Sequence, residues 1–322
     1  MKKDYSKITS DFLKVLPDKQ REIVSRRFGL KLGKRETLEA IGKDLNITRE
    51  RVRQIESDAF SKLQPEVKKQ DKVFKEIINY FKKSGGVKKE EVAFEDLSNN
   101  KNQIFFLLSL VSVLKRFGET EDFYAFWGFG KESFLNAKKN IDVIYDKVKE
   151  LGKPMKMKDL ASFVSVDVKS LESFLDISKK ILKNSEGFYG LKEWPEINPK
   201  RIKDKAYIVL KKNQKPLHFT KVAGLIPAAL PQTVHNELIK DTRFVLVGRG
   251  IYALNEWGYE KGVVKDVIKN ILKENKKPLT KEEIVQKVQE KRLVKENTIL
   301  LNLSNRKHFL RDSGGFYDIK TS

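Results

Sequence analysis

Three stretches of the chain repeat one order of features with a period of about sixty residues. Each stretch begins with a helix-length segment that ends at a Lys-Pro pair, and the prolines are Pro154, Pro216 and Pro278. Proline ends a helix because it has no backbone N–H to donate, and it biases the preceding residue toward extended geometry. Such a repeat limits the fold strongly, because each copy has to form one small structural unit of the same kind.

The end of each copy predicts a β-hairpin. An apolar run is followed by a glycine-containing turn (SEG, GRG or SGG) and then by a pair with an aromatic residue, at 188–189, 251–252 and 316–317. Two short helical segments lie between the Lys-Pro pair and this hairpin. Three helices followed by a hairpin are the pattern of a winged helix. We expect winged helices at residues 131–197, 198–258 and 259–322.

The segment 69–130 contains a divergent copy of this pattern. Its helix-like part, Val73 to Lys83, meets Gly85-Gly86 in place of Lys-Pro, and Leu114 to Trp127 resembles the closing hairpin. We expect a divergent winged helix here, so that the chain has three or four winged helices in total.

Residues 1–68, called the head below, predict a helix-turn-helix. Leu38, Ile41 and Leu45 lie on one face of a short helix, and Asn46 then marks a break, because asparagine tolerates a left-handed backbone. Thr48 is a favourable N-cap for the next helix. The apolar face of that second helix consists of Val52, Ile55, Ala59 and Leu63.

The two helices of the head have to approach closely at their crossing. Gly42 lies at that point and is small enough to allow it, as a helix-turn-helix requires. A hydrophobic content of 39% with 20 phenylalanines is sufficient for packed cores. The predicted fold class is mainly α with small β-hairpins: an N-terminal helix-turn-helix followed by three or four tandem winged-helix domains.

The second helix of the head carries polar residues that suit a DNA groove. Arg49, Glu50, Arg53 and Gln54 project from its N-terminal turns, which in this motif enter the major groove. Arginine can hold guanine O6 and N7, glutamate can accept from cytosine N4, and glutamine can pair with adenine. Positively charged side chains are electrostatically unfavourable at a helix N-terminus. The arginines at this position therefore favour the interpretation that the helix contacts DNA. The alternative is a solvated helix with internal ion pairs.

The charge of the chain favours a polyanionic partner. There are 66 Lys and Arg against 44 Asp and Glu, which gives a formal net charge of +22, and such a field attracts polyanions. The alternative is a lysine-rich composition without a nucleic-acid role, because the lysines are spread along the whole chain.

Several classes of protein are not expected. The chain has no cysteine and only three widely spaced histidines, so we expect no disulfide, metal or cofactor. The longest apolar stretch, Ile104 to Leu114, is shorter than the roughly 20 residues that span a bilayer, and the N-terminus lacks the apolar run of a signal peptide. We therefore expect a cytoplasmic protein without membrane contact. The sequence shows neither a paired-carboxylate-plus-lysine signature nor a phosphate-cradling glycine loop, so we expect no enzyme and no small-molecule substrate.

The head resembles a known family. RRFGL, TLEAIGKDLNITRERVRQIE and AFSKL are similar to region 4 of the primary bacterial sigma factors, which recognises the promoter −35 element and touches the flap of RNA polymerase. The resemblance implies double-stranded DNA and the RNA polymerase core as partners. It implies base reading by Arg49, Glu50 and Gln54, and DNA backbone contacts by Thr37, Thr48, Arg51 and Arg53. Nothing in the chain resembles sigma region 2, so we expect that the protein does not melt a promoter alone.

Residues Lys215 to Tyr259 are similar to the HARE-HTH winged helices, and the phrase DTRFVLVGRGIYALNEWG carries the similarity. These domains occur in the delta subunit of RNA polymerase, in chromatin proteins and beside restriction nucleases, and they contact DNA or act as protein adaptors. Arg249 at the expected hairpin tip is a candidate phosphate contact, with a solvated turn residue as the alternative. The presumed helix before this hairpin, TVHNELIKD, mixes Asn236 and Lys240 with Glu237 and Asp241, which argues against a strong base-reading surface.

Two functions follow from the sequence. The first is a sequence-specific, double-stranded DNA-binding transcription regulator that recognises a promoter element without melting it and acts with RNA polymerase. The second is an RNA polymerase-associated adaptor, in which the winged helices mediate protein contacts and DNA binding is secondary.

Overall fold

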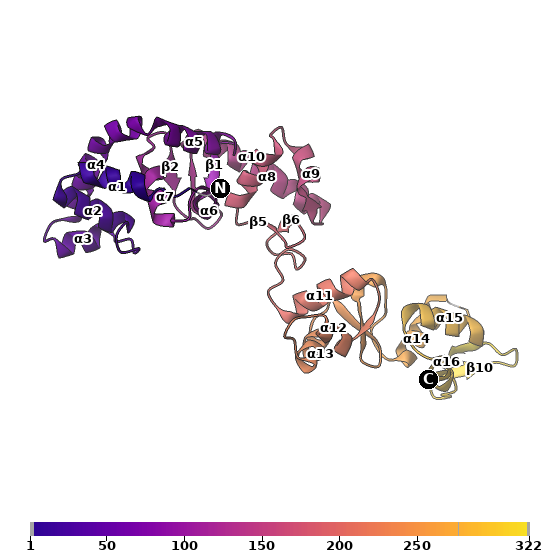
Figure 1. Ribbon diagram of the computed structural model, residues 1–322. Coiled ribbons are helices and arrows are strands. Elements are labelled where there is room, and N and C mark those ends of the chain that lie inside the picture. Colours follow the sequence, from indigo (N-terminus) through magenta and orange to yellow (C-terminus); the bar gives the residue numbers. More distant parts are fainter. Residues whose placement is uncertain (1–2, 276, 321–322) are drawn as a thin grey trace. The chain divides into compact units, whose positions relative to one another are not determined.

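The computed structural model describes residues 3–275 and 277–320, and the chain forms two compact units, Met1–Lys192 and Glu193–Ser322 (Figure 1). The first two residues of the expected head and the last two of the expected C-terminal winged helix lie outside the described residues. The protein is mainly helical with small antiparallel sheets of two or three strands, as the sequence predicts. Within the described ranges, no helix is both long and apolar enough to cross a bilayer.

Four helices build the head: α1 Ser6–Val15, α2 Asp18–Phe28, α3 Leu38–Asp44 and α4 Arg49–Lys69. Helix α2 ends at Gly29, whose φ of 65° is a left-handed value that glycine adopts without strain. Helix α4 has 21 residues and continues through Pro65. Its N-terminal turns pack on α3, while its C-terminal turns pack on the next part of the chain.

The rest of the first compact unit contains two copies of one arrangement. The first copy consists of α5 Asp71–Lys82, β1 Val87–Lys89, α6 Glu90–Leu97, α7 Lys101–Leu110, β2 Lys115–Phe117 and β3 Phe126–Gly128. The second consists of α8 Lys131–Leu151, β4 Met155–Lys156, α9 Met157–Leu160, a 3-10 turn Ala161–Phe163, α10 Val168–Ile177, β5 Ile181–Lys183 and β6 Phe188–Leu191. The sheets have the strand orders β1-β3-β2 and β4-β6-β5, because the short first strand pairs with the last strand of the hairpin. Both copies therefore have the element order of a winged helix.

The second compact unit contains two further copies. One consists of α11 Ile202–Asn213, β7 Leu217–His218, α12 Phe219–Gly224, α13 Pro231–Lys240, β8 Phe244–Gly248, β9 Ile251–Leu254 and a 3-10 turn Asn255–Trp257. The other consists of α14 Val264–Asn275, α15 Lys281–Lys291, α16 Glu296–Leu303, β10 Phe309–Arg311 and β11 Tyr317–Ile319. The strand order β7-β9-β8 repeats that of the first compact unit, and in the last copy Leu279 forms an isolated bridge with Tyr317 where the others have a short first strand.

The prolines of the repeat follow helix ends, as predicted. The helices before Pro154, Pro216 and Pro278 end at Leu151, Asn213 and Asn275. The first two of these helices are followed by a left-handed residue, Gly152 with φ 62° and Gln214 with φ 50°, which reverses the chain before the proline. Short strands β4 and β7 then begin directly after the proline, which fits the extended geometry that proline favours.

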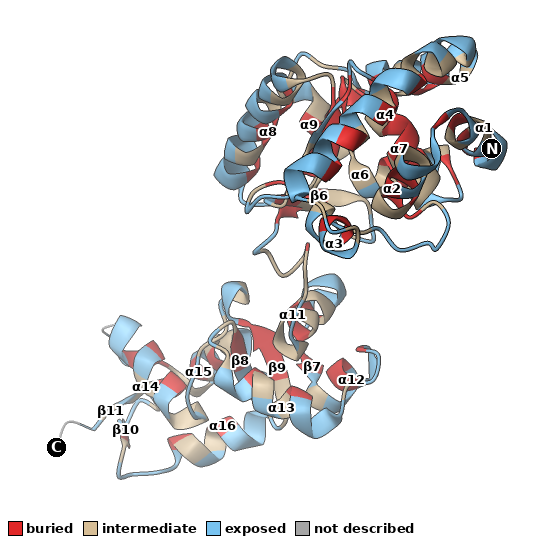
Figure 2. Ribbon diagram, turned by 90° about the vertical axis from the view of Figure 1, so that its left-hand side faces the viewer, coloured by how far each residue is buried: buried red, intermediate tan, exposed pale blue. Residues whose placement is uncertain are grey.

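The hydrophobic core of the head continues into the first winged-helix copy. Ala59 and Leu63 of α4 belong to the same buried cluster as Phe74 and Ile77 of α5 and Phe106 of α7. Figure 2 shows this buried interior in red where α4 and α7 lie side by side. The C-terminal turns of α4 therefore share a core with the first winged-helix copy, while the turn between α3 and α4 has a cluster of its own, and the boundary expected near residue 68 stays a prediction.

Candidate nucleic-acid interface

Two threonine side chains cap the helices on either side of the turn between α3 and α4. The Thr37 hydroxyl accepts a hydrogen bond from the Ala40 backbone N–H at 3.1 Å and so caps α3. The Thr48 hydroxyl caps α4 in the same way, by accepting from the Arg51 N–H at 3.1 Å. Between them Asn46 has a φ of 53°, the left-handed conformation that the sequence predicts at this break.

Gly42 allows α3 and the start of α4 to approach each other closely. A Cβ atom at this position would lie 2.7 Å from the backbone oxygen of Ile47 and 3.4 Å from the Arg49 nitrogen. Real Cβ atoms do not come so close to a backbone oxygen, so a larger residue would push the two helices apart. The predicted role of this glycine is confirmed.

The underside of the helix-turn-helix is a small apolar cluster. Ile23 of α2, Ile41 of α3 and Val52 of α4 are completely buried in it, and Ile55 is nearly so. The partly buried side chains Leu38, Leu45 and Ile47 pack against this cluster. All four apolar positions predicted for the second helix, Val52, Ile55, Ala59 and Leu63, are buried.

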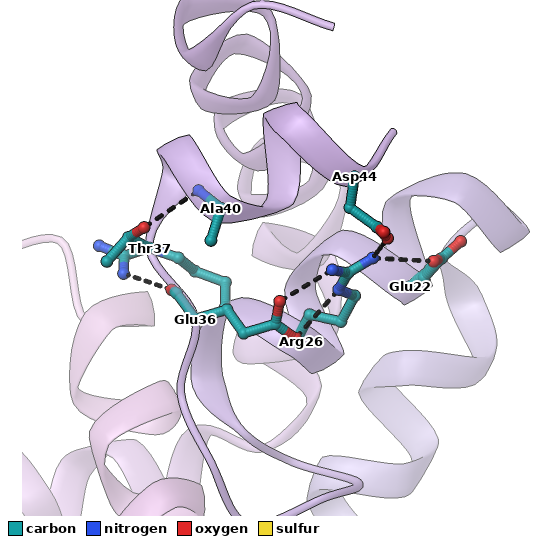
Figure 3. A network of polar contacts seen from close by, with 7 residues as sticks. Glu22, Arg26, Glu36, Thr37, Ala40 and Asp44 are labelled. Atoms are coloured by element: carbon teal, nitrogen blue, oxygen red, sulfur yellow. Dashed lines mark hydrogen bonds and ion pairs between the residues drawn. The ribbon is translucent and has the colours of Figure 1, made fainter. Parts of the chain in front are cut away.

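An arginine of α2 holds α3 at both of its ends (Figure 3). Arg26 donates two hydrogen bonds to the Glu36 carboxylate, at 3.0 and 2.8 Å, directly before the N-cap of α3. It also donates to Asp44, the last residue of α3, at 2.6 Å, and lies 3.5 Å from Glu22. These hydrogen bonds hold the pKa of the Glu36 carboxyl below its usual value. Helix α3 is therefore fixed by a charged clamp as well as by the apolar cluster.

The sequence did not single out Arg26, Glu36 or Asp44 as site residues. All three lie in stretches rich in charged residues, so the sequence alone does not show which carboxylate pairs with which arginine or lysine. Their pairing depends on the way α2 and α3 cross, and that crossing has no local signal.

The predicted base-reading residues lie on the exposed side of α4. Arg49, Glu50 and Gln54 are exposed in its first two turns, opposite the buried apolar face. Arg49 has no hydrogen-bond or ion-pair partner in the described part of the chain. The N-terminal turns of α4 therefore offer a polar surface that no other described part of the first compact unit covers.

Two side-chain contacts link the residues of this surface. The Arg53 guanidinium donates to the Glu50 carboxylate at 2.6 to 3.0 Å, and Arg51 donates to the Gln54 side-chain oxygen at 3.1 Å. The hydrogen bond from Arg53 lowers the pKa of Glu50 and so favours the charged form of this carboxyl. These are the internal contacts that the alternative of a solvated helix predicts. Both lie in full solvent, where such pairs contribute little to stability, so they present little obstacle to a competing partner.

The remaining predicted residues flank this surface, with one exception. Thr37 and Thr48 occupy the two N-caps. Thr48 and Arg51, together with Lys43, line an open hollow of about 660 Å³ beside the turn. Arg249 is exposed in the turn between β8 and β9 of the second compact unit, and so belongs to a different part of the chain.

Residues 12–64 match the family model described as Sigma-70, region 4. The RNA polymerase sigma factor SigA of Clostridium acetobutylicum is 47% identical over 51 residues, and the RNA polymerase sigma factor RpoS of Coxiella burnetii is 50% identical over 52 residues. Each alignment covers 16% of this chain, and they cover 14% and 15% of the two relatives. Residues 12–64, called the region 4 segment below, are therefore similar to sigma-70 region 4, as the resemblance of the head implies. The similarity to HARE-HTH domains lies outside these matches and stays a prediction.

The apolar side of the region 4 segment is covered by α7. Phe106 of α7 packs against Phe28 with ring centroids 5.3 Å apart. Asn102 donates to the backbone oxygens of Gly29 at 3.0 Å and Gly33 at 2.7 Å. Helix α7 is apolar on nearly all sides, as expected for a helix with buried surroundings.

The third helix of the second winged-helix copy is covered in a similar way. A Cβ at Gly85 would lie 2.7 Å from the side chains of both Ser170 and Phe174 of α10, so glycine is needed for this contact. Lys88 of β1 also donates to the Ser173 hydroxyl at 3.3 Å. In a winged helix the third helix usually faces DNA. Here α7 and α10 are used for packing within the first compact unit.

Proposed function

We propose that this protein is a sequence-specific, double-stranded DNA-binding transcription regulator, and that the N-terminal turns of α4 read the bases. The observation that carries the proposal is that the polar side of these turns is open, while the opposite side is locked to α2 and α3. A helix held in this way can enter a major groove without reorganisation of its backbone. The region 4 match over residues 12–64 supports the same function.

In the proposed complex, Arg49, Glu50 and Gln54 contact base edges. The charged state of Glu50 suits an acceptor for the cytosine N4 amine, and Arg49 suits guanine. Arg53 exchanges its contact with Glu50 for a phosphate, because phosphates offer a stronger negative field than one exposed carboxylate.

Phosphate contacts come from the residues beside the turn. Thr37 and Thr48 lie at helix N-termini, where a phosphate meets favourable backbone N–H groups. Arg51 lies at the hollow beside them and has to release only Gln54 to reach a phosphate. These contacts set the register of α4 on the duplex without reading its sequence.

The proposed activity is binding alone, without covalent chemistry, cofactor or small-molecule substrate. By its resemblance to sigma region 4, the protein recognises a promoter element and acts with RNA polymerase. It does not melt the promoter, because no counterpart of sigma region 2 is present in the sequence.

The alternative is an adaptor in which the head docks on the polymerase flap. The apolar side of the head is occupied by α7, and among the described residues of the head only Val15 and Leu32 are large, apolar and exposed. This arrangement leaves little apolar surface for a protein partner and favours DNA reading by the head. The two winged helices of the second compact unit remain the better candidates for protein contacts, and Arg249 remains a candidate phosphate contact there.

Two arginine variants test the proposal. Arg49→Ala is expected to cost about 1–3 kcal/mol of specific binding and to relax the preference at one base pair, since a base contact is lost. Arg51→Ala is expected to weaken binding to specific and random duplexes alike and to reduce the salt dependence, since a phosphate contact is lost. Titration of labelled duplexes at several salt concentrations measures both effects. Equal losses on specific and random duplexes for both variants would contradict the assignment.

A further inference from the structure

An apolar groove runs between the third winged-helix copy and the start of α14 in the second compact unit. It has a volume of about 510 Å³ and is lined by the end of α13, by β8 and by residues 261–266. Three of its lining side chains are large, apolar and exposed: Ile239 by 62%, Leu246 by 46% and Val263 by 59%. Single exposed apolar residues are common on proteins, but several in one concave patch mark a binding surface.

The walls of this groove, called the Ile239 groove below, are fixed by contacts beneath them. Arg292 is buried and donates to the backbone oxygens of Gly262 and Glu260. The backbone N–H of Leu293 donates to the Val247 oxygen at 3.0 Å and so ties the last winged-helix copy to β8. The groove is therefore preformed, which lowers the entropy cost of binding.

The rim of the Ile239 groove is positive. Lys240 and Lys261 are exposed and have no ion-pair partner among the residues that the structure describes. Asp241 lines the groove, but its charge is compensated by Arg243 at 2.8 Å and by Lys203 at 3.2 Å. Among the described lining residues, Asp266 is the one carboxylate without an ion-pair partner, so two unpaired lysines face one unpaired acid.

We propose that the Ile239 groove binds an acidic segment of a partner protein that carries apolar side chains at helical spacing. The apolar side chains fill the floor formed by Ile239, Leu246 and Val263, and the carboxylates meet Lys240 and Lys261. A nucleic acid fits less well, because its phosphates would leave the apolar floor without a partner. This inference concerns a second surface, so it can fail while the DNA-reading proposal holds.

The test uses the full chain and a short labelled synthetic peptide in which leucines at i, i+3, i+4 and i+7 alternate with glutamates. Fluorescence anisotropy measures its affinity for the protein. Ile239→Ser and Lys261→Glu are each expected to weaken binding about tenfold, which corresponds to one well-buried apolar or ionic anchor. Asp266→Asn is expected to strengthen binding, because it removes the one acidic lining residue without an ion-pair partner among the residues that the structure describes. Both Ile239 and Lys261 are exposed, so these variants should fold, and circular dichroism checks this.

Matched control variants distinguish binding in the Ile239 groove from non-specific binding elsewhere on the protein. Leu301→Ser removes an even more exposed apolar side chain from α16, outside the groove. Lys307→Glu reverses the charge of an exposed lysine elsewhere in the same compact unit. Both are expected to leave the affinity unchanged. Several outcomes would overturn the proposal: no binding, equal binding of a peptide with lysine in place of glutamate, an equal effect of Leu301→Ser, or complete displacement of the peptide by random duplex. Self-association that Ile239→Ser abolishes would also overturn it, since the occupant would then be a second copy of this chain.

Discussion

Replacing Phe106 with alanine should weaken the helix-turn-helix of the head, although Phe106 lies outside it, in α7 of the next part of the chain. Its side chain is fully buried and contacts the rings of Phe28 and Phe60 in the head, with centroids 5.3 and 6.2 Å away. A buried Phe→Ala change typically costs about 3–5 kcal/mol, because transfer energy is lost and a cavity is left. Domains of this size have a total stability of only about 5–15 kcal/mol, so the first compact unit should become marginal.

Amide hydrogen exchange of the full chain measures this effect segment by segment. We expect α2, α4 and α7 to lose protection together, because their side chains share one buried cluster. Phe316→Ala is the matched control, since this phenylalanine is partly exposed in the second compact unit and its loss should leave the first unit unchanged. If α7 lost protection while α2 and α4 kept the protection of the wild-type protein, the shared core would not couple them and the reasoning would be wrong.

Three further predictions concern the turn, the cap and the pH dependence. Gly42→Ala should destabilise the head by about 1–3 kcal/mol and abolish specific DNA binding, because its Cβ would meet the Ile47 oxygen at 2.7 Å; Gly118→Ala, which meets nothing within 4 Å, should have no such effect in thermal unfolding. Thr48→Ala should cost about 1 kcal/mol through loss of the α4 cap, and Thr48→Ser should restore most of it; an equal loss for both would exclude the cap as the cause. The hydrogen bond from Arg243 holds the pKa of Asp241 well below its usual value of 3.8, so this stabilisation is present above about pH 4 and is lost as the pH falls through the lowered pKa. Asp241→Asn should therefore lower the unfolding temperature of the second compact unit at pH 7 and flatten its decline in acid, and an unchanged acid profile would contradict this.

The helix-turn-helix could be predicted from the sequence because its signals are local. The spacing of Val52, Ile55, Ala59 and Leu63 identifies the buried face of α4, and Thr48 identifies its first turn. Asn46 takes a left-handed conformation that few other residues accept. The hairpins of the four winged-helix copies were predictable for the same reason, since their turns and aromatic residues lie close together in the chain.

The way these parts pack together could not be predicted, because it depends on contacts between distant residues. The apolar run Ile104 to Leu114 indicated only a segment too short to span a bilayer, although a helix that is apolar on all sides should be surrounded by protein. Its partners, Phe28 and Leu63, lie in the region 4 segment. The clamp of Arg26 on Glu36 and Asp44 was missed likewise, because the sequence does not say which charges meet.

Selection of duplexes from a random pool by the full chain tests the central claim most directly. If the open side of α4 reads bases, the bound fraction should converge on one short sequence, and the resemblance to sigma region 4 predicts a hexamer similar to TTGACA. Binding without enrichment of any sequence would contradict base reading by Arg49, Glu50 and Gln54 and would favour the adaptor.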